Sequence, residues 1–232
     1  MIRTTDLSPF LRGHEYPESA PRGLVPHRLP SWVGDQFPDP QLLAMEAQPS
    51  GVRLAMVTEA RSVELVLHTT RIAYRGIHRP RGSVDLVVDH QLAASDELTG
   101  GDAIETDLQT GVTTLASGPA HLARFTGLAE GEKLVELWLP HNERVELVEL
   151  RTDAPATPAP ADSRVWLHHG SSISHGSNAT SPPQTWPAVT AWLGGAALRN
   201  LGLSGNALVD PFAARVMRDT RPTSSASSWA ST

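Results

Sequence analysis

The sequence predicts two domains, an all-β sandwich or jelly roll followed by the start of a parallel α/β sheet. Three observations lead to this expectation. Short apolar runs separated by turns fill the chain from Val52 to about residue 150, a proline-rich stretch follows, and beyond it the pattern changes to strand, helix, strand, helix. A chain of 232 residues is long enough for two modest domains with buried cores.

The expected boundaries follow these changes of composition. We assign residues 1–150 to the β-sandwich domain, 151–163 to a stiff linker that holds three prolines, 164–220 to a partial α/β domain and 221–232 to a tail. Before about residue 50 the chain is irregular and rich in proline. We therefore expect an extended arm with turns there, which can contribute one edge strand.

Alternation of polar and apolar residues identifies the strands of the first domain. The runs are VRLAMVT, SVELVLHTT, SVDLVVDHQL, VTTLAS, HLARFTGL, KLVELWLP and RVELVELRT. Val63, Leu65 and Leu67 share one face of their strand. The alternation in Arg144–Arg151 is poorer, because Val145, Leu147 and Glu149 fall on one face while Glu146, Val148 and Leu150 fall on the other.

The second domain opens with two strand–helix units. The expected elements are a strand at Arg164–His168, a helix at Trp186–Leu193, a strand at Ala196–Leu203 and a helix at Pro211–Arg218. A proline lies in the first turn of each helix, where a missing N–H costs nothing. The first helix is expected to have Val189, Trp192 and Leu193 on one side.

Two such units are too few to cover both faces of a parallel sheet. We therefore expect a loose C-terminal third in which four apolar side chains are partly uncovered, unless the sandwich or another subunit shields them. These side chains are Val165, Leu167, Leu198 and Leu201.

Composition excludes several classes of function. The net charge of −6 leaves no basic stripe for a nucleic acid or an anionic membrane, and no apolar run approaches the roughly 18 residues of a membrane span. The first residues lack the pattern of a secretion signal, so we expect a cytoplasmic protein. Without cysteine there is no disulfide, thiolate metal site or cysteine nucleophile, and Lys133 is the single candidate for a Schiff base.

The junction Gly170-Ser171-Ser172-Ile173-Ser174 carries the main candidate for chemistry. It follows the first strand of the parallel sheet, and open α/β sheets bind ligands at the carboxyl ends of their strands. Ser172 is placed there as a possible nucleophile, with backbone N–H groups of the next helix available for an oxyanion. The alternative is a polar turn that caps the helix.

A second junction, NLGLSGN at residues 200–206, follows the next strand and is expected at the same sheet edge. There Gly202 and Gly205 either bring an amide N–H close to a reacting carbonyl oxygen or allow a tight turn.

Together, HHGSSISHG and NLGLSGNALVDP resemble the first two blocks of the SGNH (GDSL-type) hydrolases, in the branch with a β-sandwich ahead of a flavodoxin-like α/β domain. The resemblance implies that Ser172 is the nucleophile and an oxyanion donor through its N–H, and that Gly205 is a second donor. The family's later Asn block and Asp-x-x-His pair do not occur in this sequence. The chain is therefore expected to be a truncated member that lacks its general base.

Three histidines near the first junction are the nearby candidates to replace that base. His168, His169 and His175 occupy positions that the family does not use, and their spacing matches no zinc motif. Packed structural roles are the expectation. No metal or cofactor is expected.

The last residues, TSSASSWAST, suggest either a disordered tail or a changed reading frame. One choice of codons for Thr223–Thr232, read one base earlier, translates as DLISLKLGIN, which resembles the family's third block. We interpret the sequence as having lost its frame near Arg221, with a natural short product as the alternative.

The expected function is an ester hydrolase or deacylase that acts on small acyl esters or acylated carbohydrates through an acyl-serine intermediate, and that is inactive as the 232-residue chain. An acyltransferase is the close variant, because only the acceptor differs. The competing classes are an inert fragment and a carbohydrate-binding sandwich that uses Trp32, Trp138 or Tyr74 as a stacking face.

Overall fold

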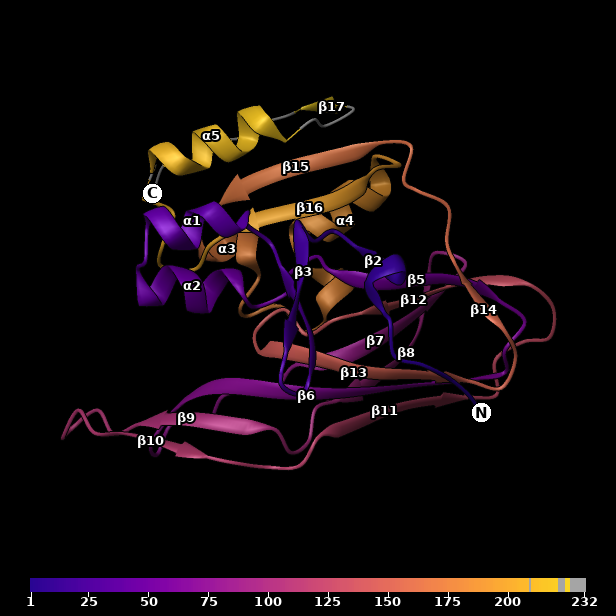
Figure 1. Ribbon diagram of the computed structural model, residues 1–232, viewed down its shortest axis with the longest axis horizontal. Coiled ribbons are helices and arrows are strands. Elements are labelled where there is room, and N and C mark those ends of the chain that lie inside the picture. The colour runs from indigo at the N-terminus through magenta and orange to yellow at the C-terminus, as the bar shows by residue number, and fades with distance from the viewer. Residues whose placement is uncertain (209, 221–223, 226–232) are drawn as a thin grey trace.

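Two β-sheets pack face to face, and a small parallel sheet with its helices lies against one of them (Figure 1). The computed structural model describes residues 1–208 and 210–220 and the backbone of Ser224–Ser225. The protein is mostly β, and it contains both antiparallel and parallel strand pairs. No helix in the described part of the chain is long and apolar enough to cross a membrane.

The outer sheet has eight strands, which pair antiparallel except for β6 with β9. Its path is β10 (Thr113–Ala116), β9 (Asp102–Thr106), β6 (Ser62–Tyr74), β13 (Arg144–Thr152), β4 (Gly23–His27) and β3 (Tyr16–Ala20), with β1 (Ile2–Thr4) on β13 and β11 (His121–Thr126) on β6.

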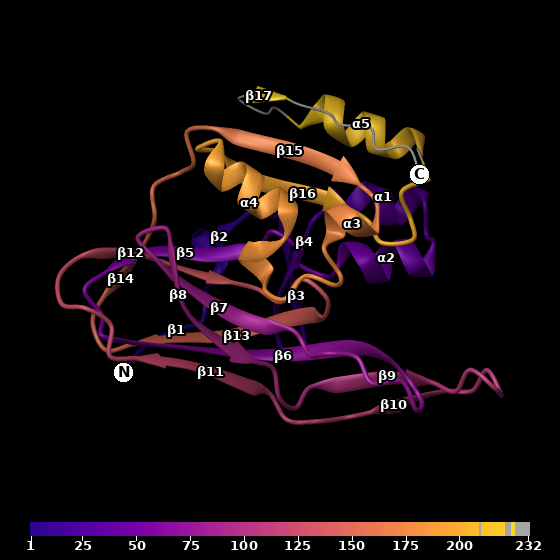
Figure 2. The ribbon, with the colours of Figure 1, turned by 180° about the vertical axis from the view of Figure 1, so that it is seen from behind.

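The inner sheet has six antiparallel strands and lies between the outer sheet and the helices, as both ribbon views show (Figure 2). Its path is β14 (Ala156–Pro158), β5 (Arg53–Thr58), β12 (Lys133–Trp138), β7 (Ser83–Val88) and β8 (Gln91–Glu97), with β2 (Leu11–Arg12) on β5. A short 3-10 helix, Ser8–Phe10, precedes β2.

The core between these sheets confirms the predicted alternation in β6. Val63, Leu65 and Leu67 have no exposed surface and join one cluster with residues of the facing sheet such as Met56 and Val135. Burial of such a continuous apolar face is the main stabilising contribution to a two-sheet packing. The jelly-roll strand order remains a prediction.

The faces predicted for Arg144–Arg151 are wrong beyond Leu147. A β-bulge shifts the register of β13 against β6 between Leu147 and Glu149. The extra residue, Val148, reverses the alternation, so Val145, Leu147 and Leu150 all point into the core.

The parallel sheet contains β16 (Ala197–Gly202), β15 (Val165–Gly170) and β17 (Ser224–Ser225), with β15 in the middle. Its helices are α3 (Ser172–His175), α4 (Trp186–Leu193) and α5 (Pro211–Asp219), and a 3-10 turn spans Pro182–Gln184. The predicted strands and longer helices are thus confirmed to within two residues at their ends.

The side of α4 that carries Val189, Trp192 and Leu193 faces solvent. These three residues are exposed, whereas Pro187, Ala188 and Ala191 are buried. The two alanines pack in a cluster with Trp138 and Val87 of the sandwich and Leu198 of β16. Small side chains on this face let the helix approach a bulky indole, and the larger apolar residues are left on the outside.

The prediction for the N-terminal arm is also wrong. The arm forms β1 to β4 and two short helices, α1 (Ser31–Gln36) and α2 (Pro40–Glu46). Asp39 caps α2 by accepting a hydrogen bond from the Leu42 N–H at 2.7 Å, and Pro40 begins the helix. Both helices lie beside the parallel sheet (Figure 1).

These helices cover most of the parallel sheet, so the expected exposure is wrong for three of the four side chains. Leu167, Leu198 and Leu201 are each at most 2% exposed, whereas Val165 is partly exposed as expected. A loose C-terminal third remains a prediction. Leu167 and Leu201 pack with Val33 and Leu42 of the arm and with α5, whereas Leu198 packs against α4 and the sandwich. Both faces of the sheet are therefore covered.

The segment predicted as a linker also takes part in the sandwich. Arg151 and Thr152 end β13, and residues 156–158 form the edge strand β14 on β5. The division of the chain into domains remains a prediction.

One buried arginine, Arg28, joins the arm to the parallel sheet. Its Nη1 donates to the carbonyl oxygens of Asn200 at 2.9 Å and Gly202 at 2.8 Å, and Nε donates to the Glu46 carbonyl at 3.1 Å. Only 1% of its surface is exposed, and burial lowers its pKa to about 10, so the side chain remains charged at neutral pH.

We expect Arg28→Met to lower the free energy of unfolding by about 3 kcal/mol, because the carbonyl groups it satisfies would remain buried without a donor. Urea unfolding followed by circular dichroism measures the change. Arg75→Met is the matched control, since its side chain is 58% exposed and its ion pairs contribute at most about 1 kcal/mol. Equal midpoints for the two variants would contradict the importance of Arg28.

Candidate active site

Ser172 lies at the carboxyl end of β15, as predicted. The strand ends at Gly170, Ser171 occupies the N-cap position of α3, and Ser172 is the first residue of that four-residue helix. Ser172 is exposed, and Ser171 makes no side-chain capping hydrogen bond. The serine pair therefore does not serve as an ordinary helix cap, and the hydroxyl of Ser172 is accessible.

The second junction lies at the same sheet edge. β15 and β16 are parallel with Gly170 opposite Gly202, and the Leu203 N–H donates to the Gly170 carbonyl at 2.9 Å. A Cβ atom on Gly202 would lie 2.4 Å from the backbone nitrogen of His175. The absent side chain thus permits α3 to contact the end of β16.

Gly205 is exposed in the turn after β16 and has a φ of +72°, a conformation that favours glycine. A Cβ atom there would lie 2.6 Å from Nε2 of Gln41 in α2. The loop that carries the predicted second oxyanion donor therefore packs against the N-terminal arm. No pattern in the sequence predicted that Gln41 would lie beside this loop.

A hydrogen-bond network fixes α3 to β16 and to the segment before β5. Asn200 Nδ2 donates to the Ser174 carbonyl at 2.8 Å and to Ser50 Oγ at 2.9 Å, while its Oδ1 accepts from the Gly202 N–H at 2.9 Å. Ser50 Oγ in turn donates to the His175 carbonyl at 2.6 Å. Asn200 is fully buried, so each of these bonds is shielded from water.

The three neighbouring histidines are buried and bonded to other groups. His168 Nε2 lies 2.8 Å from Ser174 Oγ, His169 Nδ1 donates to the Leu201 carbonyl at 3.0 Å, and His175 Nε2 donates to the His141 carbonyl at 2.8 Å. Burial lowers the pKa of His168 to about 4 and that of His175 to about 3. Within the described residues, none of the three is hydrogen-bonded to Ser172.

The remaining candidate residues lie on other elements than the two junctions that carry Ser172 and Gly205. Trp32 is in α1 with Arg215 4.1 Å from its ring, Tyr74 ends β6 beside Arg79 at 5.1 Å, and Trp138 is 9% exposed in β12. Lys133 is buried, and its Nζ donates to the Gly131 carbonyl at 2.7 Å.

The predicted tail at residues 221–232, with its changed reading frame, falls outside the described residues apart from two backbone positions. Only the backbone of Ser224–Ser225 is described in this region, and it pairs in parallel with Trp166 and Leu167.

Two solved structures match 97% of the chain. The salicylyl-acyltransferase SsfX3 from a tetracycline biosynthetic pathway matches with a TM-score of 0.81 and 26% identity. A GDSL-like lipase from Bacteroides ovatus matches with a TM-score of 0.72 and 19% identity. These matches agree with the predicted resemblance of the chain to the SGNH (GDSL-type) hydrolases.

The chain spans 60% of the length of the acyltransferase and 63% of that of the lipase. No protein-family model matches it, and no curated protein does.

Gly202→Ala tests the close approach of α3 to β16. Because the new methyl group would collide with backbone rather than with a movable side chain, we expect about 3 kcal/mol of destabilisation in urea unfolding. Gly34→Ala is the control, since its new methyl group would make only an ordinary contact at 3.5 Å with a Leu43 side-chain carbon and it lies within α1. A Gly202→Ala protein as stable as that control would refute the contact.

The buried histidines make stability depend on pH. His168 has a pKa of about 4 in the folded protein and about 6.5 in the unfolded protein. Below pH 6.5 the unfolded state therefore binds more protons than the folded state, and the free energy of unfolding decreases as the pH is lowered. Between pH 7 and pH 5 the loss from His168 is about 2 kcal/mol.

We expect His168→Gln to show a smaller loss of stability than the wild type over this range, measured by urea unfolding at both pH values. His78→Gln, at an exposed position, is the control and is expected to keep the wild-type dependence. An unchanged pH dependence in His168→Gln would show that His168 is not held neutral.

Proposed function

We propose that this chain contributes the nucleophile and two oxyanion donors of a serine acyl-transfer site of the SGNH kind. The observation that carries the proposal is the exposed Ser172 at the end of β15, on the same sheet edge as the Gly205 loop. The backbone N–H groups of Ser172 and Gly205 are the donors that we assign to the developing oxyanion.

In the proposed reaction the Ser172 oxygen attacks the carbonyl carbon of an ester. Its proton passes to a base, the bond to the leaving alcohol breaks, and the alcohol departs with a proton. Water or a second alcohol then attacks the acyl-serine, receives the acyl group and returns the proton to Ser172. Water gives an esterase or deacylase, and an alcohol gives an acyltransferase.

The base is not assigned to the neighbouring histidines. His168 and His175 are held neutral, but their Nε2 atoms are bonded to other groups and their Nδ1 atoms are buried away from solvent, and His169 donates to Leu201. A serine without a partner base is a weak nucleophile, so we expect slow turnover from the 232-residue chain.

The substrate class rests on the relatives. One match is a salicylyl-acyltransferase and the other is a GDSL-like lipase, and both names denote proteins that act on acyl groups. We therefore propose small acyl esters or acylated carbohydrates as substrates.

Acetylation by p-nitrophenyl acetate tests the proposal. We expect mass spectrometry of the quenched protein to place an acetyl group on Ser172, and imidazole added as an external base to accelerate its formation. Ser172→Ala should lose this adduct and reduce the imidazole-dependent release of nitrophenolate at least tenfold after subtraction of the protein-free rate.

Ser171→Ala is the matched control, because the neighbouring hydroxyl also lies at the start of α3 but is not the assigned nucleophile. The proposal fails if the adduct forms at another residue, or if Ser172→Ala and Ser171→Ala react alike.

A further inference from the structure

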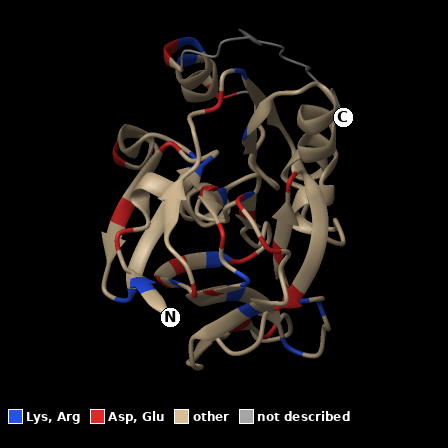
Figure 3. Ribbon diagram, turned by 90° about the vertical axis from the view of Figure 1, so that its right-hand side faces the viewer, with Lys and Arg blue, Asp and Glu red and all other residues tan. Residues whose placement is uncertain are grey.

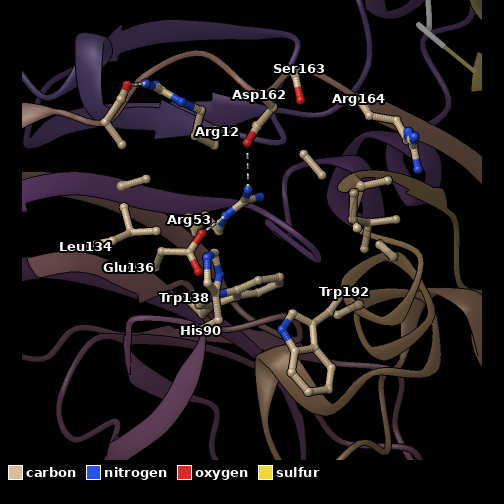
Figure 4. Close-up of a pocket in the computed structure, with 18 of the residues that line it drawn as sticks. Arg12, Arg53, His90, Leu134, Glu136, Trp138, Asp162, Ser163, Arg164 and Trp192 are labelled. Carbon is tan, nitrogen blue, oxygen red and sulfur yellow. Dashed lines mark hydrogen bonds and ion pairs between the residues drawn. The ribbon is translucent and has the colours of Figure 1, made fainter.

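A cavity of about 480 Å³ lies at the other end of the parallel sheet from Ser172. Arg53, Glu136 and Trp138 of the sandwich form one wall, the segment before β15 forms the rim, and Ala191 and Trp192 of α4 form the opposite wall (Figure 4). β15 runs between the two sites. Its six residues separate them by roughly 20 Å, so the cavity is distinct from the candidate active site.

The polar wall is built around Arg53, which is 5% exposed. Its Nε is paired with Glu136, its Nη2 lies 3.5 Å from Asp162, and its guanidinium lies 5.2 Å from the centre of the Trp138 ring. Nη1 has no hydrogen-bond partner among the described residues. A buried donor without a partner is costly, and a small rotation of the Arg53 side chain toward a ligand oxygen in the cavity would relieve that cost.

The charges of the cavity lining are mixed and nearly balanced. Acidic and basic residues are interspersed across the molecule (Figure 3), and the cavity is lined by Arg12, Arg53 and Arg164 together with Glu136 and Asp162 (Figure 4). Arg12 and Arg164 donate to the backbone carbonyls of Ala159 and Gly194, and the two carboxylates flank Arg53, so an anion would be attracted by Arg53 but repelled by the carboxylates. A hydroxyl group can accept from a guanidinium and donate to a carboxylate at the same time.

The remaining wall supplies apolar contact. Trp192 is 58% exposed, and Ala188, Ala191 and Ala197 lie beside it along the cavity. An exposed indole next to fixed polar groups suits a ligand with one apolar ring face and a polar edge. We propose that this cavity binds a neutral saccharide of one or two sugar units, with a ring face on Trp192 and hydroxyl groups toward Arg53 and Asp162.

Titration calorimetry of the whole chain tests the ligand class. The neutral probes are cellobiose, maltose, xylobiose and N,N′-diacetylchitobiose, and the charged probes are glucuronate and inorganic phosphate. We expect saturable binding of at least one neutral disaccharide, at least tenfold tighter than that of either anion. Binding of none of the four disaccharides, or tighter binding of an anion, overturns the proposal.

Variants then locate the site. Trp192→Ala should weaken the disaccharide at least tenfold, because the ring platform is lost. Leu193→Ala is the matched control, since it is the next residue of α4, is 73% exposed and does not line the cavity. If both variants bind like the wild type, the sugar binds elsewhere and the proposal is wrong.

The Asp162→Asn variant distinguishes a neutral sugar from an anion as the ligand, because its affinities for the two are expected to change in opposite directions. Loss of the charged acceptor should weaken a neutral sugar several-fold, whereas an anion would bind more tightly once the repulsion is removed. Calorimetry measures binding of these sugars without any ester hydrolysis, so the results do not depend on whether Ser172 is a nucleophile.

Discussion

The geometry of the candidate site depends on one buried cation. Arg28 donates to the carbonyl groups at the end of β16 and to those at the end of α2, and so holds the arm and the parallel sheet in a fixed relation. The planar guanidinium presents five N–H donors spread over three nitrogens, so it can reach acceptors on both elements, whereas a lysine would offer three donors on a single nitrogen. Because Gly202 is one of these acceptors and also contacts α3, the position of Ser172 is set partly by a residue of the arm.

A helix as short as α3 cannot hold a serine in place by itself. Its four residues are far fewer than an isolated helix needs in water. Its position comes from outside, through Asn200 of β16, the Ser50 hydroxyl and the carbonyl of His141. The β-sandwich and its arm therefore supply part of the framework of the candidate site.

Local pattern predicted much of the fold but not the contacts between its parts. β6, α4 and α5 could be read from periodicity and proline position, and Ser172 and Gly205 could be placed at one edge because parallel strands end together. The arm helices could not, since their burial depends on residues more than a hundred positions away. The same holds for Arg28, whose acceptor Asn200 is 172 residues later in the chain.

The distance along the chain between Arg28 and Asn200 has a consequence for the order in which parts of the protein fold during synthesis. On a ribosome adding about 5–20 residues per second, Arg28 is synthesised roughly 10–35 s before Asn200. During this interval α1 and α2 lack their partners in β15, β16 and α5, and helices of their length are unstable alone. We infer that these two helices, although made early, are among the last parts to acquire their structure during biosynthesis.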